Sequence, residues 1–579
     1  MLRGLIPCSY IQEVLQMKIP RPEHPKPQFQ RENWLNLNGS WQFEIDNAQS
    51  GMERRFYEQE NFSSTIQIPF CPESRLSGIG HTDFLYGIWY KRKVTLEDRQ
   101  LTGLIRLHFG AVDYRCTVFV NGQKAGEHTG GYISFYLDIT HLVHSGENTI
   151  VVFAADDTRS RTIPSGKQSE RYQSFGCFYT RTTGIWQTVW LEFLPKTHIQ
   201  SVRYYPDIHN TQLIISAQLS GAAQLKATAY YEGRKVGEAS VNCGGGQQSL
   251  TLSLTESHLW EPGCGCLYDL KLTYGEDAVT SYFGLRQICL DGSRFLINGK
   301  SVFQRLVLDQ GFYPEGIYTA PDDSDLLEDI IRSMDMGFNG ARLHEKIFEE
   351  RFLYHCDRMG YLVWGEYPDW GLDNSLADSI YSILPEWLEE LERDFNHPAI
   401  IGWCPHNETR SDQRDEAIRT VYRTTKALDP TRPCIDASGY FHVETDVFDI
   451  HDYEQNPEIF KRNYDRLPKE NVLHNPLAPR QVYQGQPVFI SEYGGIAWNA
   501  ADGGWGYGEG PQTEQEFLQR FAGLTDALLD NSRIFALCYT QLTAVEQEQN
   551  GLYTYDRRPK FNPQTIKSIL SRPAAIEQE

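Results

Sequence analysis

Residues 302–343 read VFQRLVLDQGFYPEGIYTAPDDSDLLEDIIRSMDMGFNGARL, and this stretch decides the fold of the second half of the chain. Residues 302–308 form an apolar run that predicts a buried strand. Residues 323–336 carry apolar side chains at helical spacing, and residues 338–343 are again a short apolar run. A strand, a helix and a second strand in this order indicate one unit of a parallel β/α fold.

The same alternation continues toward the C-terminus. It predicts eight strands, mostly separated by helices, in about 290 residues, which is the number and span of a (β/α)8 barrel. We therefore assign residues 289–579 to such a barrel. The other predicted strands are 361–364, 399–404, 434–437, 447–450, 487–490 and 534–539, and the other predicted helices are 347–359, 385–395 and 416–428.

The first 288 residues show a different pattern, in which short strands with alternating polarity recur and no long helix is predicted. Turn signals such as Asn121-Gly122 separate these strands. The pattern predicts one β-sandwich over residues 1–196 and a second one, of immunoglobulin-like size, over residues 197–288. Predicted strands are 41–45, 88–94, 105–109, 117–120, 150–153 and 185–193 in the first, and 212–219, 224–231, 248–254 and 268–274 in the second.

The composition is that of a well-packed soluble protein, with 40% hydrophobic, 13% aromatic and 22% charged residues. The 54 Lys and Arg residues face 76 Asp and Glu residues, and the formal net charge of -22 argues against binding to nucleic acid or to an anionic membrane. No apolar run is long enough to predict a membrane span, and the opening residues 1–17 do not resemble a signal peptide. The twelve cysteines lack zinc-type spacing and are expected to be free thiols, which fits a cytoplasmic location.

Polar side chains gather at the C-terminal ends of the predicted barrel strands, where barrels of this kind carry their chemistry. Two carboxylates stand out, because Glu408 follows the strand 399–404 and Glu492 follows the strand 487–490. Paired carboxylates suit glycoside cleavage, since one donates a proton to the leaving oxygen while the other stabilises or attacks the anomeric carbon. A third strand-end carboxylate, Glu366, is expected to support the site by hydrogen bonding.

At these residues the sequence resembles glycoside hydrolase family 2, the β-galactosidase and β-glucuronidase family. Residues 396–408, NHPAIIGWCPHNE, and residues 488–494, VFISEYG, look like the acid/base and nucleophile motifs of that family. Residues 183–190, TGIWQTVW, are typical of its N-terminal domain. The resemblance covers nearly the whole chain and implies a jelly-roll-type, sugar-binding-like sandwich, then an immunoglobulin-like sandwich, then a catalytic TIM barrel.

The resemblance also implies roles for five side chains. Glu408 would be the general acid/base and Glu492 the nucleophile of a retaining mechanism. Asn407 would bind the sugar 2-hydroxyl, and Arg342 would hold the nucleophile ionised through a charge-assisted hydrogen bond. Tyr453 corresponds to a tyrosine that positions the nucleophile, and the alternative is a tyrosine that only packs beside the site.

Two candidate substrate-binding residues remain open because the chain departs from the family pattern around them. His344 is displaced by one position from the histidine of the family motif, so it either reaches the substrate or is an ordinary surface or supporting histidine. Trp498, on the glycine-rich loop after the second motif, forms either an aglycone platform or an anchor for the loop. The last predicted strand lacks the stacking tryptophan of many family members.

No metal site and no cofactor are predicted. The 16 histidines form no metal-binding motif, and His442, His451 and His474 are expected to face solvent or to be hydrogen-bonded. No glycine-rich dinucleotide motif follows a strand, and the glycosidase mechanism needs no cofactor.

The region after the last strand bears on the sugar. Family β-glucuronidases recognise the sugar carboxylate there with an Asn-x-Lys motif, whereas this chain has Glu548 and Asn550, or in the other register Asn550 and Leu552. Without the ammonium, a buried uronate would lose a bond worth about 1.5–3 kcal/mol. This favours a neutral hexoside, with β-galactoside first by family frequency. The cations that could restore uronate binding from another direction are Arg557, Arg558 and Lys560.

The sequence therefore predicts an exo-acting, retaining β-glycosidase of the β-galactosidase type that acts on terminal β-linked hexose in a small carbohydrate or glycoside. The alternatives are a β-glucuronidase or β-galacturonidase of the same family, a transglycosylase that uses the same intermediate, and a catalytically inactive carbohydrate-binding protein. Assembly into a homo-oligomer is left open.

Overall fold

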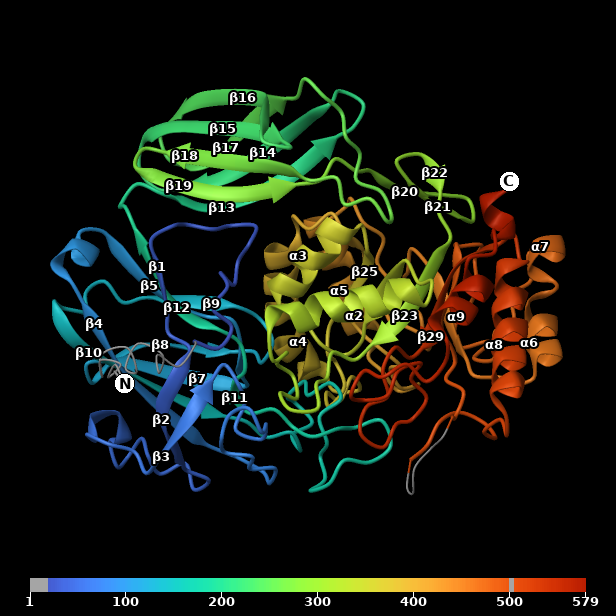
Figure 1. Cartoon of the computed structure of the whole chain (residues 1–579), viewed down its shortest axis with the longest axis horizontal. Coiled ribbons are helices and arrows are strands. Elements are labelled where there is room, and N and C mark those ends of the chain that lie inside the picture. The colour runs from blue at the N-terminus through green and yellow to red at the C-terminus, as the bar shows by residue number, and fades with distance from the viewer. Residues whose placement is uncertain (1–18, 499–503, 579) are drawn as a thin grey trace, which may run out of the picture.

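The computed structural model describes residues 19–498 and 504–578, whose strands and helices fall into three successive regions. Figure 1 shows two β-sandwiches, coloured blue to green, beside a barrel coloured yellow to red. The predicted fold class is confirmed: β-sandwich domains precede a parallel α/β barrel. Within the described ranges, no helix has the length and apolar character needed to cross a membrane.

The first region is an antiparallel sandwich whose two sheets share one apolar core. Its core takes Trp41 and Tyr90 from one sheet and Leu107 from the other, all 1% exposed or less. The smaller sheet has the order β1 (Trp34–Asn36), β12 (Val189–Leu194), β5 (Leu104–Phe109) and β9 (Phe135–Asp138). The larger sheet has the order β3 (Ser64–Ile68), β2 (Gly39–Ile45), β4 (Ile88–Leu96), β10 (Gly146–Ala155), β7 (Arg115–Val120) and β8 (Gln123–Thr129). A separate pair contains β6 (Val112–Asp113) and β11 (Gly184–Ile185).

The second region is a smaller antiparallel sandwich with its own core. Buried apolar residues alternate with exposed polar residues along its strands, as in β18 (Tyr268–Tyr274). One sheet has the order β13 (Ile199–Asp207), β14 (Gln212–Leu219) and β17 (Gly246–Ser253), and the other has β16 (Arg234–Cys243), β15 (Ala223–Tyr231), β18 and β19 (Asp277–Phe283). A short antiparallel sheet of β20 (Ile288–Asp291), β21 (Arg294–Ile297) and β22 (Lys300–Ser301) leads into the barrel.

A buried arginine joins the two sandwiches. Arg31 donates two hydrogen bonds to Asp277 of β19, at 2.7 and 2.8 Å, and one of 2.9 Å to Glu192 of β12. A fourth bond, to the carbonyl of Ile199, measures 2.6 Å. All three charged residues are less than 5% exposed, so this cluster fixes one sandwich against the other.

The third region is the barrel, in which seven parallel strands follow one another in chain order. The strands are β23 (Gln304–Asp309), β24 (Gly340–Leu343), β25 (Leu362–Glu366), β26 (Ile400–Cys404), β27 (Phe448–Asp452), β28 (Val488–Gly494) and β29 (Ile534–Thr540), and β29 pairs with β23. The helices between and after them are α2 (Asp323–Asp335), α3 (Glu350–Met359), α4 (Ile380–Asp394), α5 (Asp415–Leu428), α6 (Pro457–Tyr464), α7 (Leu467–Glu470), α8 (Glu514–Leu529) and α9 (Pro563–Leu570).

Two predicted barrel elements differ from the structure. The predicted strand 434–437 forms only isolated bridges beside β26, because the side chains of Asp436 and Asp446 accept backbone N–H groups that a strand would use for its ladder. The helix predicted to begin at Pro385 begins at Ile380, so the proline lies inside α4. The carbonyl that loses its partner at this proline belongs to Tyr381, which is 77% exposed.

A long loop of the first sandwich, residues 156–183 between β10 and β11, reaches the barrel, and we call it the mouth loop. The backbone N–H groups of Ser165 and Gly166 donate to the carbonyl of Trp370, at 2.7 and 3.0 Å. Gly166 has φ 53°, and a Cβ there would lie 2.5 Å from the carbonyl oxygen of Glu345. Only glycine allows this close approach, so the loop and the barrel touch backbone to backbone.

Candidate active site

The ends of four barrel strands and the turns after them bring five polar side chains together. Arg342 lies in β24, His451 in β27 and Glu492 in β28, while Tyr453 directly follows β27. Glu408 lies four residues beyond β26, where its backbone N–H donates to the carbonyl of Ser438 at 2.9 Å. The backbone of Glu408 has φ 46°, a left-handed conformation that is uncommon for a residue other than glycine and occurs often at functional sites.

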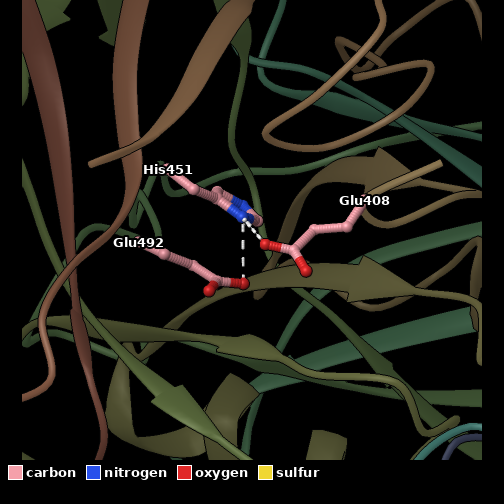
Figure 2. A group of neighbouring side chains, drawn as sticks. All are labelled: Glu408, His451 and Glu492. Carbon is pink, nitrogen blue, oxygen red and sulfur yellow. Dashed lines mark hydrogen bonds and ion pairs between the residues drawn. The ribbon is translucent and has the colours of Figure 1, made fainter. Parts of the chain in front are cut away.

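The two carboxylates lie close together with an imidazole between them (Figure 2). Nδ1 of His451 lies 2.6 Å from Oε1 of Glu408, and Nε2 lies 3.4 Å from Oε1 of Glu492. One oxygen of each carboxylate and one nitrogen of the imidazole all lie within 4.8 Å of one another. The side chain of Glu408 is 20% exposed and that of Glu492 is 5% exposed, so Glu408 is the more accessible of the pair.

Arg342 distributes its donors over three residues around Glu492. It donates to Glu492 Oε1 at 2.8 Å, to Glu366 Oε2 at 2.5 Å and to Asn407 Oδ1 at 2.6 Å. The hydroxyl of Tyr453 donates to the other oxygen of Glu492, and the Tyr453 ring stacks on Tyr507 with centroids 3.5 Å apart. Both oxygens of Glu492 therefore accept bonds that favour its ionised form.

The charges around the pair lower the pKa of both carboxyl groups and raise the pKa of the imidazole that bridges them. Burial by itself would raise the pKa of Glu492, but His451 and Arg342 lower it below its ordinary value. Burial likewise opposes the ionisation of Glu408, yet the hydrogen bond from His451 lowers the pKa of that carboxyl. The pKa of His451 is raised, because Glu492 and Glu408 outweigh the effect of burial. A proton in this cluster is thus held by the imidazole, within transfer distance of Glu408.

Asn407 offers a free donor beside the carboxylates. Its Oδ1 accepts from Arg342 and its backbone N–H donates to Asp369 at 2.8 Å, which fixes the side chain. Its Nδ2 is buried and has no hydrogen-bond partner among residues 19–498 and 504–578. A buried amide that is held at one end and unpaired at the other is suited to donate to a bound ligand.

The structure places the other predicted residues as follows. Glu366 bonds Arg342 and also His344, whose Nδ1 lies 2.9 Å from its Oε1. Burial, and then the nearby Lys167, lower the pKa of His344 well below its ordinary value, so this imidazole is neutral. The ring of Trp498 packs against Phe517 of α8 and against Phe561. These are the contacts of a loop anchor rather than of an aglycone platform.

Two residues of the site were not singled out by sequence reasoning. His451 was expected to face solvent or to be hydrogen-bonded, and its side chain is only 2% exposed and bridges the carboxylates. Its position at the end of a barrel strand was a usable signal. Lys167, on the mouth loop, has its ammonium 3.6 Å from the ring centroid of Trp370. No motif in the sequence connects this lysine to a barrel that begins more than a hundred residues later.

The bridged carboxylates also meet a distance condition for a metal site, since three potential ligand atoms converge. The imidazole already contacts both carboxylates, Glu408 through Nδ1 and Glu492 through Nε2.

Comparisons with known proteins agree with this architecture. Three family models match the chain: the sugar binding domain of glycosyl hydrolases family 2 over residues 82–192, the family 2 domain over 197–286, and the family 2 TIM barrel domain over 288–572.

Similar proteins carry the names of two activities. A β-glucuronidase of Mus musculus is 31% identical over 69% of this chain and 67% of its own, and a β-galactosidase of Thermoanaerobacter pseudethanolicus is 26% identical over 73% of this chain and 58% of its own. A β-glucuronidase from an uncultured Clostridium sp. has a similar fold, with a TM-score of 0.78 and 20% identity over 93% of this chain and 98% of its own. Proteins named β-glucuronidase predominate among the relatives.

Proposed function

Since this chain belongs to glycosyl hydrolase family 2 and is a retaining glycosidase, we propose that it removes terminal β-linked glucuronic acid from glycosides. The observation that supports the reaction is the short separation of Glu408 and Glu492, whose nearest oxygens lie within 4.8 Å. Retaining enzymes place the two carboxyl groups about 5–5.5 Å apart, whereas inverting enzymes need a wider gap for a water molecule.

In the proposed mechanism Glu492 attacks the anomeric carbon while Glu408 protonates the leaving oxygen. The bonds from Arg342 and Tyr453 keep Glu492 ionised before the attack. Water then hydrolyses the glycosyl-enzyme intermediate, with Glu408 acting as the base. The free Nδ2 of Asn407 is suited to the sugar 2-hydroxyl, a contact that strengthens in the transition state.

Two arguments point to different sugars. The prediction of a β-galactoside rested on family frequency and on the missing ammonium after the last strand. The predominance of relatives named β-glucuronidase supports the alternative, a uronide, better than that first choice. The missing ammonium then means that a sugar carboxylate must be recognised from another part of the chain.

The test is a comparison of kcat/KM on nitrophenyl β-glucuronide, β-galacturonide, β-galactoside and β-glucoside. We expect the glucuronide to be hydrolysed fastest, with β-configured glucuronic acid as the first product by proton NMR. A preference for a neutral hexoside would reject the proposed sugar. Binding without turnover on any of the four would support the alternative of an inactive carbohydrate-binding protein.

A further inference from the structure

The mouth loop carries a buried cation into the region of the catalytic carboxylates. Lys167 is 4% exposed, and its ammonium lies over the ring of Trp370. Among residues 19–498 and 504–578, this ammonium makes no hydrogen bond and no ion pair with a carboxylate, and its contact is with the indole ring. The Nζ atom is not one of the fully enclosed atoms that lack a partner, so the ammonium keeps some access from outside and its three N–H groups can donate to a bound ligand.

The position of Lys167 is fixed by its neighbours in the loop. On one side, Ser165 and Gly166 bond the carbonyl of Trp370, and on the other side the carbonyl of Lys167 accepts from the N–H of Tyr179 at 2.7 Å. The indole N–H of Trp370 donates to the carbonyl of Asn407 at 3.1 Å. The lysine is therefore held against the same indole that borders the residue preceding Glu408.

The surroundings of Lys167 are acidic. Burial by itself would lower the pKa of the ammonium, but acidic groups around it, Cys177 and Glu548 foremost, raise it above its ordinary value. Lys167 also acts on the barrel, since it contributes to the lowered pKa values of both Glu408 and His344. The charged form is thus retained at the mouth, close to the catalytic pair.

In the described part of the barrel, no free cation lies at the place where the family motif would have one. Glu548 accepts from Tyr179 at 2.5 Å and from Asn550 at 3.0 Å, so these residues satisfy one another. The three cations considered from sequence are also engaged elsewhere: Arg557 with Asp329, Arg558 with Asp556, and Lys560 with the carbonyl of Gln549.

We propose that Lys167, delivered by the first sandwich, binds the carboxylate of the sugar and selects uronides over neutral hexosides. This inference rests on the proposed function, because it needs a substrate with a carboxylate. A uronate would supply the acceptors that the ammonium lacks, and the ammonium would compensate the burial of the uronate. The alternative role, a counterion for Glu345 and Glu548, is weakened by the absence of an ion pair within 4.0 Å in the described part of the chain.

The experiment compares Lys167→Met with wild type on nitrophenyl β-glucuronide and nitrophenyl β-glucoside. Loss of a hydrogen bond to a charged group corresponds to roughly 10- to 150-fold. We expect the ratio of kcat/KM for glucuronide over glucoside to fall by that factor, and Lys167→Arg to restore part of it. Lys124→Met, on the exposed strand β8, is the matched control and should leave the ratio unchanged.

A binding measurement separates carboxylate recognition from general damage. In calorimetry, Lys167→Met should weaken D-glucaro-1,5-lactone, which carries a carboxylate, far more than D-glucono-1,5-lactone, which does not. Equal weakening of both lactones, or an unchanged substrate ratio in a variant with the wild-type melting temperature, would overturn the role of Lys167. If the wild-type enzyme prefers the glucuronide and Lys167→Met keeps that preference, the proposed function stands. Only the inference about Lys167 is then rejected.

Discussion

Two buried arginines of this protein use the same chemistry for different purposes. Arg31, between the sandwiches, gives two bonds to one carboxylate, one to a second carboxylate and one to a carbonyl. Arg342, in the barrel, gives single bonds to Glu366, Glu492 and Asn407. Both residues are 3% exposed or less, so burial alone does not distinguish them.

The two clusters differ in whether the partners of the arginine keep unpaired hydrogen-bonding groups. At Arg31 the bidentate pair with Asp277 satisfies both groups, and the cluster connects two domains. At Arg342 the divided bonds leave the amide of Asn407 unpaired on one side and orient Glu492 without closing it off. An unpaired hydrogen-bond donor beside the buried charges, rather than the buried charges themselves, therefore distinguishes the ligand site from the structural cluster.

The largest expected effect is the loss of turnover in Glu492→Gln. An amide cannot form the covalent intermediate, so kcat should fall by about 10⁴-fold, while the amide still occupies the same space. Turnover of nitrophenyl β-glucuronide measures kcat, and a urea unfolding curve checks that the variant keeps its stability. Turnover within tenfold of wild type would remove Glu492 from the nucleophile role.

The matched change at the other arginine is Glu192→Gln, which should lower stability and leave turnover unchanged. Burial opposes ionisation of Glu192, but His108 and Arg31 lower its pKa below the ordinary value of 4.5. Such a carboxylate stabilises the fold at pH values above 4.5 and loses this contribution as the pH falls through its folded pKa. The stability difference between wild type and Glu192→Gln should therefore shrink as the pH is lowered below 4.5.

The next largest effect on turnover is expected for Glu408→Gln, and it depends on the leaving group. General acid catalysis contributes about 10²–10⁴-fold, and a poor leaving group needs the proton most. We expect a loss in that range on alkyl glucuronides and a much smaller loss of the first step on nitrophenyl glucuronide. Equal losses on both substrates would show that Glu408 does not donate the proton.

Much of the fold could be predicted because strand and helix periodicity reflects burial. The predicted strands 212–219 and 268–274 coincide with β14 and β18, since alternating side chains in a half-buried strand leave an unambiguous pattern. The segment 434–437 failed for a different reason. Its apolar pattern is that of a strand. The carboxylates of Asp436 and Asp446, however, accept its backbone N–H groups, and hydrophobic periodicity contains no information about such bonds.

The residues of the candidate site likewise fall into those that could be predicted from the sequence and those that could not. Glu408 and Glu492 were singled out because strand ends in one barrel must converge, wherever they lie in the sequence. Arg342 and Asn407 were assigned to the site through the family resemblance. Lys167 could not be found by that argument. It reaches the mouth through the contact of Gly166 with the backbone beside Glu345, and this contact between two domains has no periodic signature in either of them.

The next prediction compares alanine substitutions at the two arginines. Breaking a buried ion pair by removing one partner costs about 3–5 kcal/mol, so Arg31→Ala should lose that much unfolding free energy and keep the turnover number of the folded enzyme. Arg342→Ala should lose about 10²-fold in turnover, because Glu492 loses a group that lowers its pKa. Unfolding curves and active-site titration measure both. If Arg342→Ala lost stability but kept its turnover number, Arg342 would have a structural role like that of Arg31.

The smallest expected effect is a narrower pH profile in His451→Asn. The raised pKa of His451 and the lowered pKa of Glu408 mean that their shared proton stays on the imidazole, 2.6 Å from the acid, as the pH rises past neutrality. Without the imidazole, Glu408 must hold this proton alone, so the basic limb of kcat/KM should move to lower pH. The acidic limb should move to higher pH. Burial raises the pKa of Glu492, and without His451 only Arg342 of these two groups remains to lower it.

Substrates with different leaving groups separate these two shifts. On an alkyl glucuronide we expect both limbs to move, with a loss of roughly tenfold on the basic side beyond any loss at the optimum. On nitrophenyl glucuronide, whose leaving group needs little protonation, the basic shift should nearly vanish while the acidic shift, which reports the nucleophile, persists. A basic limb that stays in place on the alkyl substrate would mean that Glu408 keeps its proton unaided, and that His451 only orients the two carboxylates, as Arg31 orients its partners between the sandwiches.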